Sequence, residues 1–397
     1  MKYAIVIPDG MADYPCEELD GKTPLEAAFT PNMDALALKG RVGLVNTIPR
    51  GMYPGSDIAI LSILGYDPKT YYPGRAGLEA ESLGVALEDD DIAFRCNLVT
   101  VDEDRLLDYS AGHIGTKEAS VLLDVLNAEL GSDEIRFYVG VSYRHLMVWK
   151  RRRGMAISTV PPHDTMGERL KDHLPKGEDA DDLVRIMLSS RELLERHEIN
   201  TVRLDLGENP ASMVWLWGEG RKASLPAFRE RFGVSGAAIS GVGLVKSLAK
   251  LIGWEVVDVP GATGYLDTDY AAKGRYACDA LKSFDMVLVH VEAPDEASHE
   301  ASVTEKVRAI EKVDKEVLGP VVSAIEGYDE YRVLVMPDHY TPTEARTHTS
   351  EPVPFLVSGK DVSVVRSIDF TEEAAKETDL VVSRGHELME YFLRGQR

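Results

Sequence analysis

The 397-residue sequence lacks any apolar run approaching the roughly 20 residues of a transmembrane helix. Its first residues enter an apolar, strand-like segment without the basic stretch of a signal peptide. Only three cysteines are present, Cys16, Cys96 and Cys278, and their spacing fits neither a disulfide framework nor a zinc site. These absences predict a reduced, cytoplasmic protein that does not associate with membranes.

Positive charge is also scarce, because 44 Lys and Arg residues face 66 Asp and Glu residues, for a net charge of −22. Nucleic acid is therefore not an expected partner, since phosphate backbones recruit basic surfaces. A small phosphorylated metabolite remains compatible, because metal ions can make one pocket of an acidic protein positive. No apolar stripe stands out as an interface, which leaves the oligomeric state open.

The order of predicted elements indicates an α/β fold with a mostly parallel sheet flanked by helices. Strands are expected at residues 1–8, 42–46, 255–259, 286–291, 332–337 and 353–357, and helices at 242–251, 270–281, 303–325 and 386–393. The βα alternation stops in the middle of the chain. There we expect a hairpin of residues 143–149 and 155–159 around the basic tip 150–153, and a helix 183–197 capped by the preceding acidic loop. We interpret residues 82–229 as an α+β domain inserted into a core of residues 1–81 and 230–397, and expect the insert to act as a lid.

Residues of metal-binding or nucleophilic type recur where predicted strands end and helices begin. They are Asp9, Ser56, Asp295, His299, Asp338, His339 and His348. The carboxyl ends of strands in an open α/β sheet lie at one edge, so these residues can converge. Carboxylates and imidazoles together suit divalent transition metals.

Each residue alone has a simpler interpretation. Asp295 and His299 share one face of a helical turn, as many surface pairs do. Ser56 resembles an ordinary helix N-cap, and Asp9 could cap a turn with Gly10. The whole ordered set is harder to explain by chance, and it indicates phosphoryl chemistry on a metal-activated serine.

This order of ligands resembles that of the alkaline phosphatase superfamily. Within it, the chain is similar to the archaeal-type cofactor-independent phosphoglycerate mutases and their bacterial relatives, through motifs that run nearly end to end. They include Pro8-Asp9-Gly10, Gly55-Ser56-Asp57, Phe94-Arg-Cys-Asn97, Ser110-Ala-Gly-His-Ile114, Pro161-Pro-His-Asp164, Trp215-Leu-Trp-Gly-Glu-Gly220 and Pro260-Gly-Ala-Thr-Gly264.

The resemblance implies an isomerase of glycolysis that interconverts 3-phosphoglycerate and 2-phosphoglycerate through a phosphoserine on Ser56. It implies two divalent ions, with manganese favoured over magnesium, cobalt or zinc, and no 2,3-bisphosphoglycerate. One ion would be held by Asp295, His299 and His348, and the other by Asp9, Ser56, Asp338 and His339. Lys246 would lie near the transferring phosphate, although Ser247 follows it where the family often has glycine.

The lid must grip a carboxylate and hydroxyl groups while excluding water. The candidate residues for this task are Arg95, Arg144, His145, His163 and Asp164. Trp215 and Trp217 alternate as in a strand and are expected to pack in a core.

Other functions remain open at this stage. A phosphatase or another phosphate-ester mutase would use the same scaffold, and a homoserine kinase is a further alternative, although no Gly-x-x-x-x-Gly-Lys-Ser/Thr loop is present. A catalytically silent metal-binding protein would have no reason to keep the serine.

Overall fold

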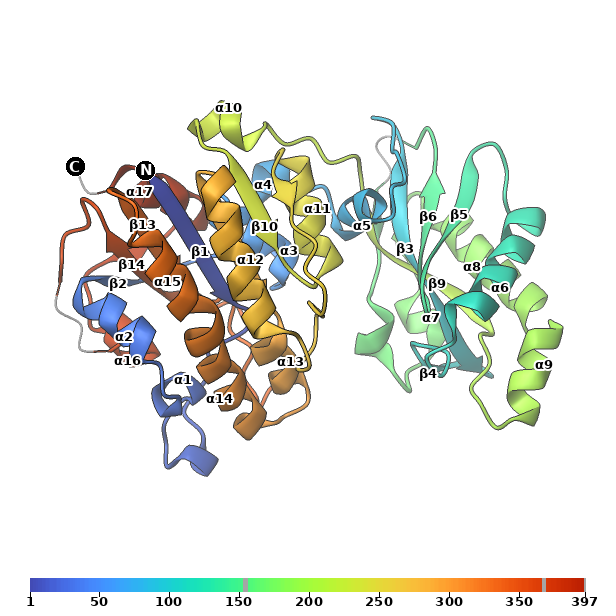
Figure 1. Cartoon of the computed structure of the whole chain (residues 1–397). Helices are drawn as coiled ribbons and strands as arrows, with labels where there is room; N and C mark the ends of the chain where they lie inside the picture. Colours follow the sequence, from blue (N-terminus) through green and yellow to red (C-terminus); the bar gives the residue numbers. More distant parts are fainter. Residues whose placement is uncertain (153–155, 366–368, 396–397) are drawn as a thin grey trace. The chain divides into compact units, whose positions relative to one another are not determined.

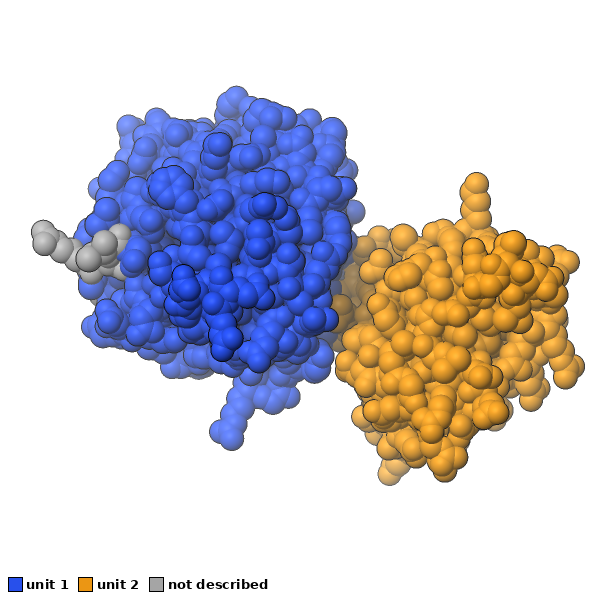
Figure 2. Space-filling view, turned by 90° about the horizontal axis from the view of Figure 1, so that it is seen from below, with its two compact units in different colours: residues 1–72, 225–397 blue, residues 73–224 orange. Residues whose placement is uncertain are grey.

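The computed structural model describes residues 1–152, 156–365 and 369–395. They form two compact units (Figure 2): unit 1 comprises residues 1–72 and 225–397, and unit 2 comprises residues 73–224. The boundaries expected from the sequence, 82 and 229, lie nine and five residues later, and helix α5 (Arg75–Ser82) belongs to unit 2. No helix of the described residues is long and apolar enough to cross a membrane.

Unit 1 is built on an eight-stranded sheet. Its strands, in spatial order, are β11 (Glu255–Val256), β10 (Gly236–Ile239), β12 (Met286–Val291), β1 (Lys2–Pro8), β13 (Tyr331–Val335), β14 (Val353–Gly359), β2 (Gly40–Val45) and β15 (Val381–Val382). Only β14 runs antiparallel to its neighbours. The predicted α/β class with a mostly parallel sheet is confirmed.

Strand β1 explains why this sheet is parallel and central. Its residues from Tyr3 to Pro8 are buried on both faces, as a nearly continuous apolar run requires. Val6 pairs with Val289 on one side and Val335 on the other. Helices α12 (Tyr270–Ser283) and α15 (Gly319–Ile325) cover one face (Figure 1), and Tyr3 packs edge-on against Phe392 on the other.

The remaining helices of unit 1 connect or flank these strands. They are η1 (Glu17–Leu19), α1 (Pro24–Ala27), α2 (Pro31–Leu38), α3 (Ser56–Ile63), α4 (Pro68–Tyr71), α10 (Phe228–Phe232), α11 (Gly243–Leu251), α13 (Ala293–His299), α14 (Val303–Lys312), the π-helical η3 (Val313–Leu318), α16 (Glu372–Lys376), η4 (Gly385–Glu387) and α17 (Leu388–Arg394). The single helix expected over residues 303–325 is thus divided into α14, η3 and α15. The change of winding precedes Pro320, whose missing N–H cannot continue the α-helical ladder.

Unit 2 contains a five-stranded antiparallel sheet around the long strand β3 (Ile92–Asp102). Its partners are β4 (Arg105–Asp108), β6 (Arg144–Trp149) and β9 (Met213–Gly220), and β5 (Ile135–Val141) pairs with β6. Other elements are α6 (Thr116–Glu129), β7 (Ile157–Ser158), η2 (Pro162–Thr165), α7 (Leu170–His173), β8 (Lys176–Gly177), α8 (Ala180–Leu194) and α9 (Glu198–Asp205). Trp215 and Trp217 lie buried on β9, as their alternation predicted.

The predicted hairpin of residues 143–149 and 155–159 is wrong. Strand β6 is a central strand that pairs with β3 and β5, whereas the two-residue strand β7 pairs with β8. Residues 153 and 155, which belong to the predicted tip and second strand, lie outside the described residues. The strands before and after the basic residues, β6 and β7, belong to two different sheets. The residue types of a turn do not specify which strands pair.

Two further boundaries differ from the prediction. Helix α8 begins at Ala180 and ends at Leu194, and the Asp179 side chain accepts a hydrogen bond from Ala156 N–H instead of capping the helix. The strand expected at residues 255–259 has only two residues, and this strand, β11, lies at the edge of the sheet.

Candidate active site

The sheet brings segments that are distant in sequence to one edge. Asp9 follows β1, and Asp338 and His339 follow β13, while β12 leads into α13, which carries Asp295 and His299. Because β12, β1 and β13 are adjacent and parallel, their carboxyl ends meet at this edge. All seven predicted residues gather there in two clusters.

The first cluster consists of Asp295, His299 and His348. Nε2 of His299 lies 3.1 Å from an Asp295 carboxylate oxygen and 3.1 Å from Nε2 of His348, which is 3.4 Å from the other Asp295 oxygen. Nδ1 of His299 lies 2.9 Å from the Arg346 carbonyl oxygen, an acceptor that fixes the proton on Nδ1 in the neutral ring. Two facing imidazole nitrogens need a proton or a cation between them, and Asp295 raises the pKa of His299 to about 9.

The second cluster consists of Asp9, Asp338 and His339, all with no exposed surface, together with Ser56. Nε2 of His339 lies 3.6 Å from Asp9 Oδ1, 3.4 Å from Asp338 Oδ2 and 3.1 Å from the Ser56 hydroxyl oxygen. Ser56 is the first residue of α3, after the N-cap Gly55, so it does not itself cap the helix. The positive end of the helix dipole lies at this hydroxyl.

The polar atoms of the second cluster have few partners within the protein. Asp338 Oδ1 accepts hydrogen bonds from the N–H groups of Gly10 and His339, whereas Oδ2 of Asp338 and both oxygens of Asp9 accept none from the described residues. Burial, reinforced by the Asp338 charge, raises the pKa of Asp9 well above its usual range. Buried carboxylates without donors are costly unless a cation binds them. The two donor sets therefore suit divalent cations bound by carboxylates and imidazoles.

Thr341, which the sequence-based reasoning missed, connects the two clusters. Its hydroxyl lies 2.5 Å from Asp295 Oδ1 and 3.1 Å from Nδ1 of His339. The ionised carboxylate can only accept, so the hydroxyl donates to Asp295 and accepts from Nδ1–H of His339. This direction leaves the lone pair of His339 on Nε2, the atom that faces Ser56, Asp9 and Asp338.

Three residues beside the clusters were also missed. Nε2 of His290 lies 3.0 Å from Asp9 Oδ2, and its Nδ1 lies 3.7 Å from Glu292 Oε2. Burial lowers the pKa of Lys273 to about 8, and its ammonium group lies 3.2 Å from the His290 carbonyl oxygen. A signal for the first two was present, since His290 interrupts an apolar strand and Glu292 follows its end. By contrast, the predicted Lys246 is only partly buried and forms an ion pair with Asp258 at 3.0 Å.

Unit 2 contains its own positively charged cluster. The guanidinium group of Arg95 lies 4.2 Å from the Trp217 ring centroid, with Glu79 at 2.7 Å from its Nε. The His163 ring packs edge-on against Trp217, and its Nε2 lies 3.8 Å from Asp164. Burial, aided by the nearby charges of Arg75 and Arg144 and opposed by Glu79, lowers the pKa of Arg95 to about 10. Four of the five predicted substrate residues therefore lie in or around one cluster: Arg95, Arg144, His163 and Asp164.

His145, the fifth predicted substrate residue, is buried in the sheet of unit 2. Its Nδ1 accepts a hydrogen bond from Gly140 N–H at 3.1 Å, which ties β6 to β5. Burial lowers its pKa to about 4, so the ring is neutral near pH 7.

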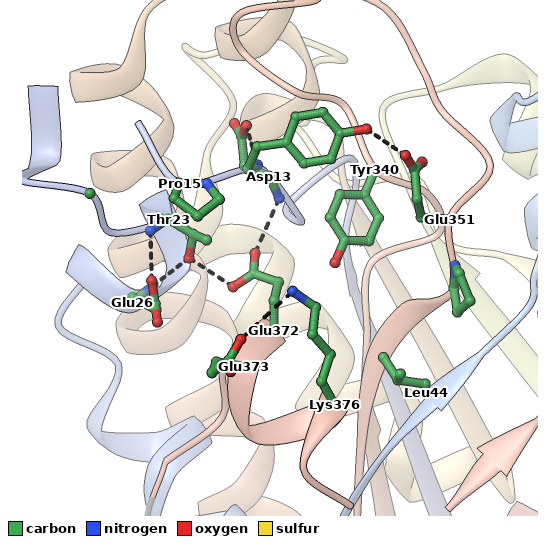
Figure 3. Close-up of a pocket in the computed structure, with 13 residues that line it drawn as sticks. Asp13, Pro15, Thr23, Glu26, Leu44, Tyr340, Glu351, Glu372, Glu373 and Lys376 are labelled. Carbon is green, nitrogen blue, oxygen red and sulfur yellow. Dashed lines mark hydrogen bonds and ion pairs between the residues drawn. The ribbon is translucent and has the colours of Figure 1, made fainter. Parts of the chain in front are cut away.

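A separate cavity of about 390 Å³ lies in unit 1 (Figure 3). It contains none of the seven predicted residues, although Tyr340 in its wall follows His339. Its carboxylates already have partners: Glu372 accepts from Thr23 and from Asp13 N–H, and Glu351 accepts from Tyr14. The paired carboxylates of this cavity do not resemble the unpaired oxygens of the two clusters.

Comparison with known proteins identifies the family. Residues 37–200 match the model of the 2,3-bisphosphoglycerate-independent phosphoglycerate mutases. The chain is 51% identical to 2,3-bisphosphoglycerate-independent phosphoglycerate mutase 2 of Methanothermobacter thermautotrophicus, covering 99% of this chain and 97% of the relative. It is 47% identical to a probable enzyme of the same description from Geobacter sulfurreducens, covering 99% and 100%.

Solved structures agree with the sequence relatives. A Pyrococcus horikoshii protein has a TM-score of 0.82 at 31% identity, covering 100% of this chain and 98% of that one. The cofactor-independent phosphoglycerate mutase of Thermoplasma acidophilum has a TM-score of 0.67 at 27% identity, covering 99% of both chains. The resemblance drawn from the sequence motifs is confirmed: the chain belongs to the archaeal-type 2,3-bisphosphoglycerate-independent phosphoglycerate mutases, a family with bacterial members.

Proposed function

We propose that the protein interconverts 3-phosphoglycerate and 2-phosphoglycerate through a phosphoserine at Ser56, within a centre that holds two divalent cations. The single observation that carries this proposal is the 3.1 Å distance between the Ser56 hydroxyl oxygen and Nε2 of His339, beside three carboxylate oxygens of Asp9 and Asp338 that accept no hydrogen bond from the described residues. Phosphoglycerate mutase activity agrees with the family of the chain.

In the first half-reaction, the Ser56 oxygen attacks phosphorus, the bond from phosphorus to the substrate C3 oxygen breaks, and the serine proton is balanced by protonation of that oxygen. In the second, the C2 hydroxyl of the retained glycerate attacks the phosphorus of phosphoserine and loses its proton, the bond from phosphorus to the Ser56 oxygen breaks, and Ser56 is reprotonated. Bound divalent cations would lower the pKa of the serine hydroxyl and offset the phosphate charge. The α3 N-terminus supports the same charge with its dipole.

The protein's own residues set the geometry of this reaction. Thr341 holds the Nε2 lone pair of His339 toward the serine, as the direction of its hydrogen bonds requires. Gly10 donates its N–H to Asp338 and thereby leaves only one oxygen of that carboxylate for a cation. Lys246 is assigned to the substrate phosphate, and its ion pair with Asp258 must then open during turnover.

The positive cluster of unit 2 is assigned to the glycerate. Arg95 and Arg144 supply the charge that a carboxylate requires, and His163 with Asp164 supplies hydrogen-bonding groups for the hydroxyls. Retention of glycerate and exclusion of water would separate a mutase from a phosphatase. In this proposal His145 contributes through the packing of β6 against β5.

Carboxylate and imidazole ligands accept several divalent ions, and manganese remains the favoured ion, with magnesium, cobalt and zinc as alternatives. No 2,3-bisphosphoglycerate is required, because Ser56 itself carries the phosphoryl group between the two hydroxyls. A cytoplasmic location with a phosphoglycerate substrate completes the proposal.

A coupled assay of 3-phosphoglycerate conversion tests the proposal, using EDTA-treated protein reloaded with Mn²⁺ in the absence of nucleotide and 2,3-bisphosphoglycerate. The wild type is expected to turn over, and Ser56→Ala to lose activity while keeping its metal content and fold. Ser62→Ala is the matched control, because Ser62 lies on the same helix but donates to the Thr47 carbonyl. An active Ser56→Ala enzyme would refute the phosphoserine route, and ATP-dependent phosphorylation of homoserine without mutase activity would replace the proposed substrate.

A further inference from the structure

The motif Gly55-Ser56-Asp57 contains a carboxylate that the proposed centre does not use. Asp57 is buried but belongs to neither metal-ligand cluster, and its Oδ1 accepts a hydrogen bond from the N–H of Ile58 at 3.0 Å. A Cβ built on Gly55 would lie 2.8 Å from the same oxygen. The carboxylate of Asp57 therefore packs against the residue before Ser56 and binds the second residue after it.

The orientation of Ser56 depends on this turn of the backbone. The N–H of Ile58 also donates to the Gly55 carbonyl oxygen at 3.1 Å, so one donor is shared between that carbonyl and the Asp57 carboxylate. Such shared hydrogen bonds are common where helices begin. A movement of the carboxylate consequently shifts the backbone on both sides of Ser56, whose hydroxyl oxygen lies 3.1 Å from Nε2 of His339.

The other oxygen of Asp57 is held by a tyrosine at the end of a segment of unit 1. The Tyr72 hydroxyl donates to Asp57 Oδ2 at 2.5 Å, and the Tyr72 ring packs against the small apolar cluster that contains Ile58. Tyr72 is the last residue of unit 1 before the chain enters unit 2 at Pro73. One hydrogen bond thus joins the start of the nucleophile helix to the point where the chain leaves unit 1.

The backbone is fixed on both sides of this point. Pro73 restricts the preceding residue to extended backbone, and Tyr72 has φ −72° and ψ 115°. The Pro73 carbonyl oxygen accepts a hydrogen bond from the N–H of Arg221, which also belongs to unit 2, at 2.6 Å. Because both residues are anchored, a change in the direction of the chain here reaches the Asp57 side chain through the Tyr72 hydroxyl.

We propose that Asp57 positions the Ser56 nucleophile, and that its hydrogen bond with Tyr72 makes this position depend on the chain segment that leads into unit 2. The inference rests on the proposed function, because it takes Ser56 as the nucleophile. In-line attack on phosphorus requires an accurately placed oxygen, and a displacement of about 1 Å can cost about 100-fold in rate. Asp57 and Tyr72 act through Ser56 and are positioning residues.

Tyr72→Phe tests the proposal in the coupled mutase assay with the full chain reloaded with Mn²⁺. The substitution removes the hydroxyl and keeps the ring in its apolar cluster. We expect kcat to fall by about 10–100-fold, while KM for 3-phosphoglycerate stays within about twofold and the manganese content equals that of the wild type. Tyr66→Phe is the matched control, because this buried tyrosine donates to the Pro226 carbonyl oxygen at 2.7 Å, and it should keep the wild-type kcat.

Substitutions of Asp57 test the same pair if Tyr72→Phe does not fold. Asparagine accepts from the Ile58 N–H through its oxygen and donates its amide to the Tyr72 oxygen, so Asp57→Asn should keep kcat within a few fold of the wild type. Asp57→Ala loses both contacts and should match Tyr72→Phe. In the double variant of Asp57→Ala and Tyr72→Phe, kcat should fall no further than in Asp57→Ala alone, because the two side chains act as one unit.

The outcomes separate this inference from the proposed function. A wild type that does not convert 3-phosphoglycerate would overturn the proposed function and this inference with it. An active wild type with an equally active Tyr72→Phe would overturn this inference alone, and so would an equal fall of kcat in Tyr66→Phe. Effects that multiply in the double variant would show that Asp57 and Tyr72 act independently, which also overturns it.

Discussion

Thr341→Val offers a test of how the two metal clusters are coupled. Valine has nearly the shape of threonine but neither donates nor accepts a hydrogen bond. The substitution removes the 2.5 Å hydrogen bond to Asp295 and leaves Nδ1–H of His339 without its 3.1 Å acceptor. Since Thr341 and His339 are fully buried, water does not replace the lost partner.

The expected magnitude follows from the role of supporting groups around metal ligands. Loss of such a partner typically lowers metal affinity by about 10–100-fold, or about 1.4–2.8 kcal/mol. Thr341 contacts one ligand of each cluster, so both ions should bind more weakly. A buried, unsatisfied N–H also costs about 1–3 kcal/mol in the metal-free protein, which should lower its melting temperature.

Calorimetric titration of metal-free protein with Mn²⁺ measures this effect, with turnover and thermal unfolding followed in parallel. Thr341→Ser keeps the hydroxyl and should restore both affinities to within a few fold of the wild type. The reasoning would be refuted if Thr341→Val bound both ions as the wild type does. Weakening of only one ion would show that the hydroxyl supports a single cluster.

Three other substitutions probe separate features. Gly10→Ala should weaken metal binding, because a Cβ at this position would lie 2.4 Å from Thr341 Oγ1 and 2.5 Å from Asp295 Oδ1. Gly10 has φ +58°, so the control for backbone strain is Gly51→Ala, at φ +88° with open space around it. Equal loss of metal in both variants would show that the collision is not the cause. Asp338→Asn should remove one Mn²⁺ per chain, counted by mass spectrometry, while Asp295 and His299 keep theirs; a full complement would mean that the second cluster is misassigned. His145 has a pKa of about 4 in the folded protein against 6.5 when unfolded, so its contribution to the free energy of unfolding is fully present above pH 6.5 and is lost as pH falls toward 4, by up to about 3 kcal/mol. Denaturant unfolding of His145→Gln at several pH values should lack this part of the pH dependence. A profile equal to that of the wild type would exclude it.

The sequence contained enough to predict the sheet and the residues that gather at its edge. Strand β12 begins and ends where its apolar run does, and Asp9 and Asp338 stand where neighbouring strands stop. The physical reason is that a strand buried on both faces must be apolar along its length, so a carboxylate at its end is conspicuous. His348 was identified as a metal ligand only by its position in the order of the motifs, because the residues next to it in the sequence do not indicate metal binding.

Other features depend on contacts that sequence spacing does not encode. Thr341 looks like one more loop threonine, and only folding brings its hydroxyl between Asp295 and His339. Strand β6 was paired with the wrong partner, because a basic turn after an apolar run indicates a reversal without saying which strands meet. His290 was overlooked because a single histidine inside a strand is usually a packed core residue.

The centre also indicates how the fold depends on its ligands. Its residues are spread along the sequence from Asp9 to His348 and lie in loops and helices. Several of their buried oxygens accept no hydrogen bond within the described protein. Such atoms oppose folding of the metal-free chain, because they give up water without a replacement. A cation that binds only the folded state stabilises it by about 2.7 kcal/mol at a free concentration 100 times its dissociation constant. Metal binding should therefore hold the carboxyl ends of β12, β1 and β13 together. The unpaired oxygens that make the site reactive also make the stability of this edge of the sheet depend on bound cations.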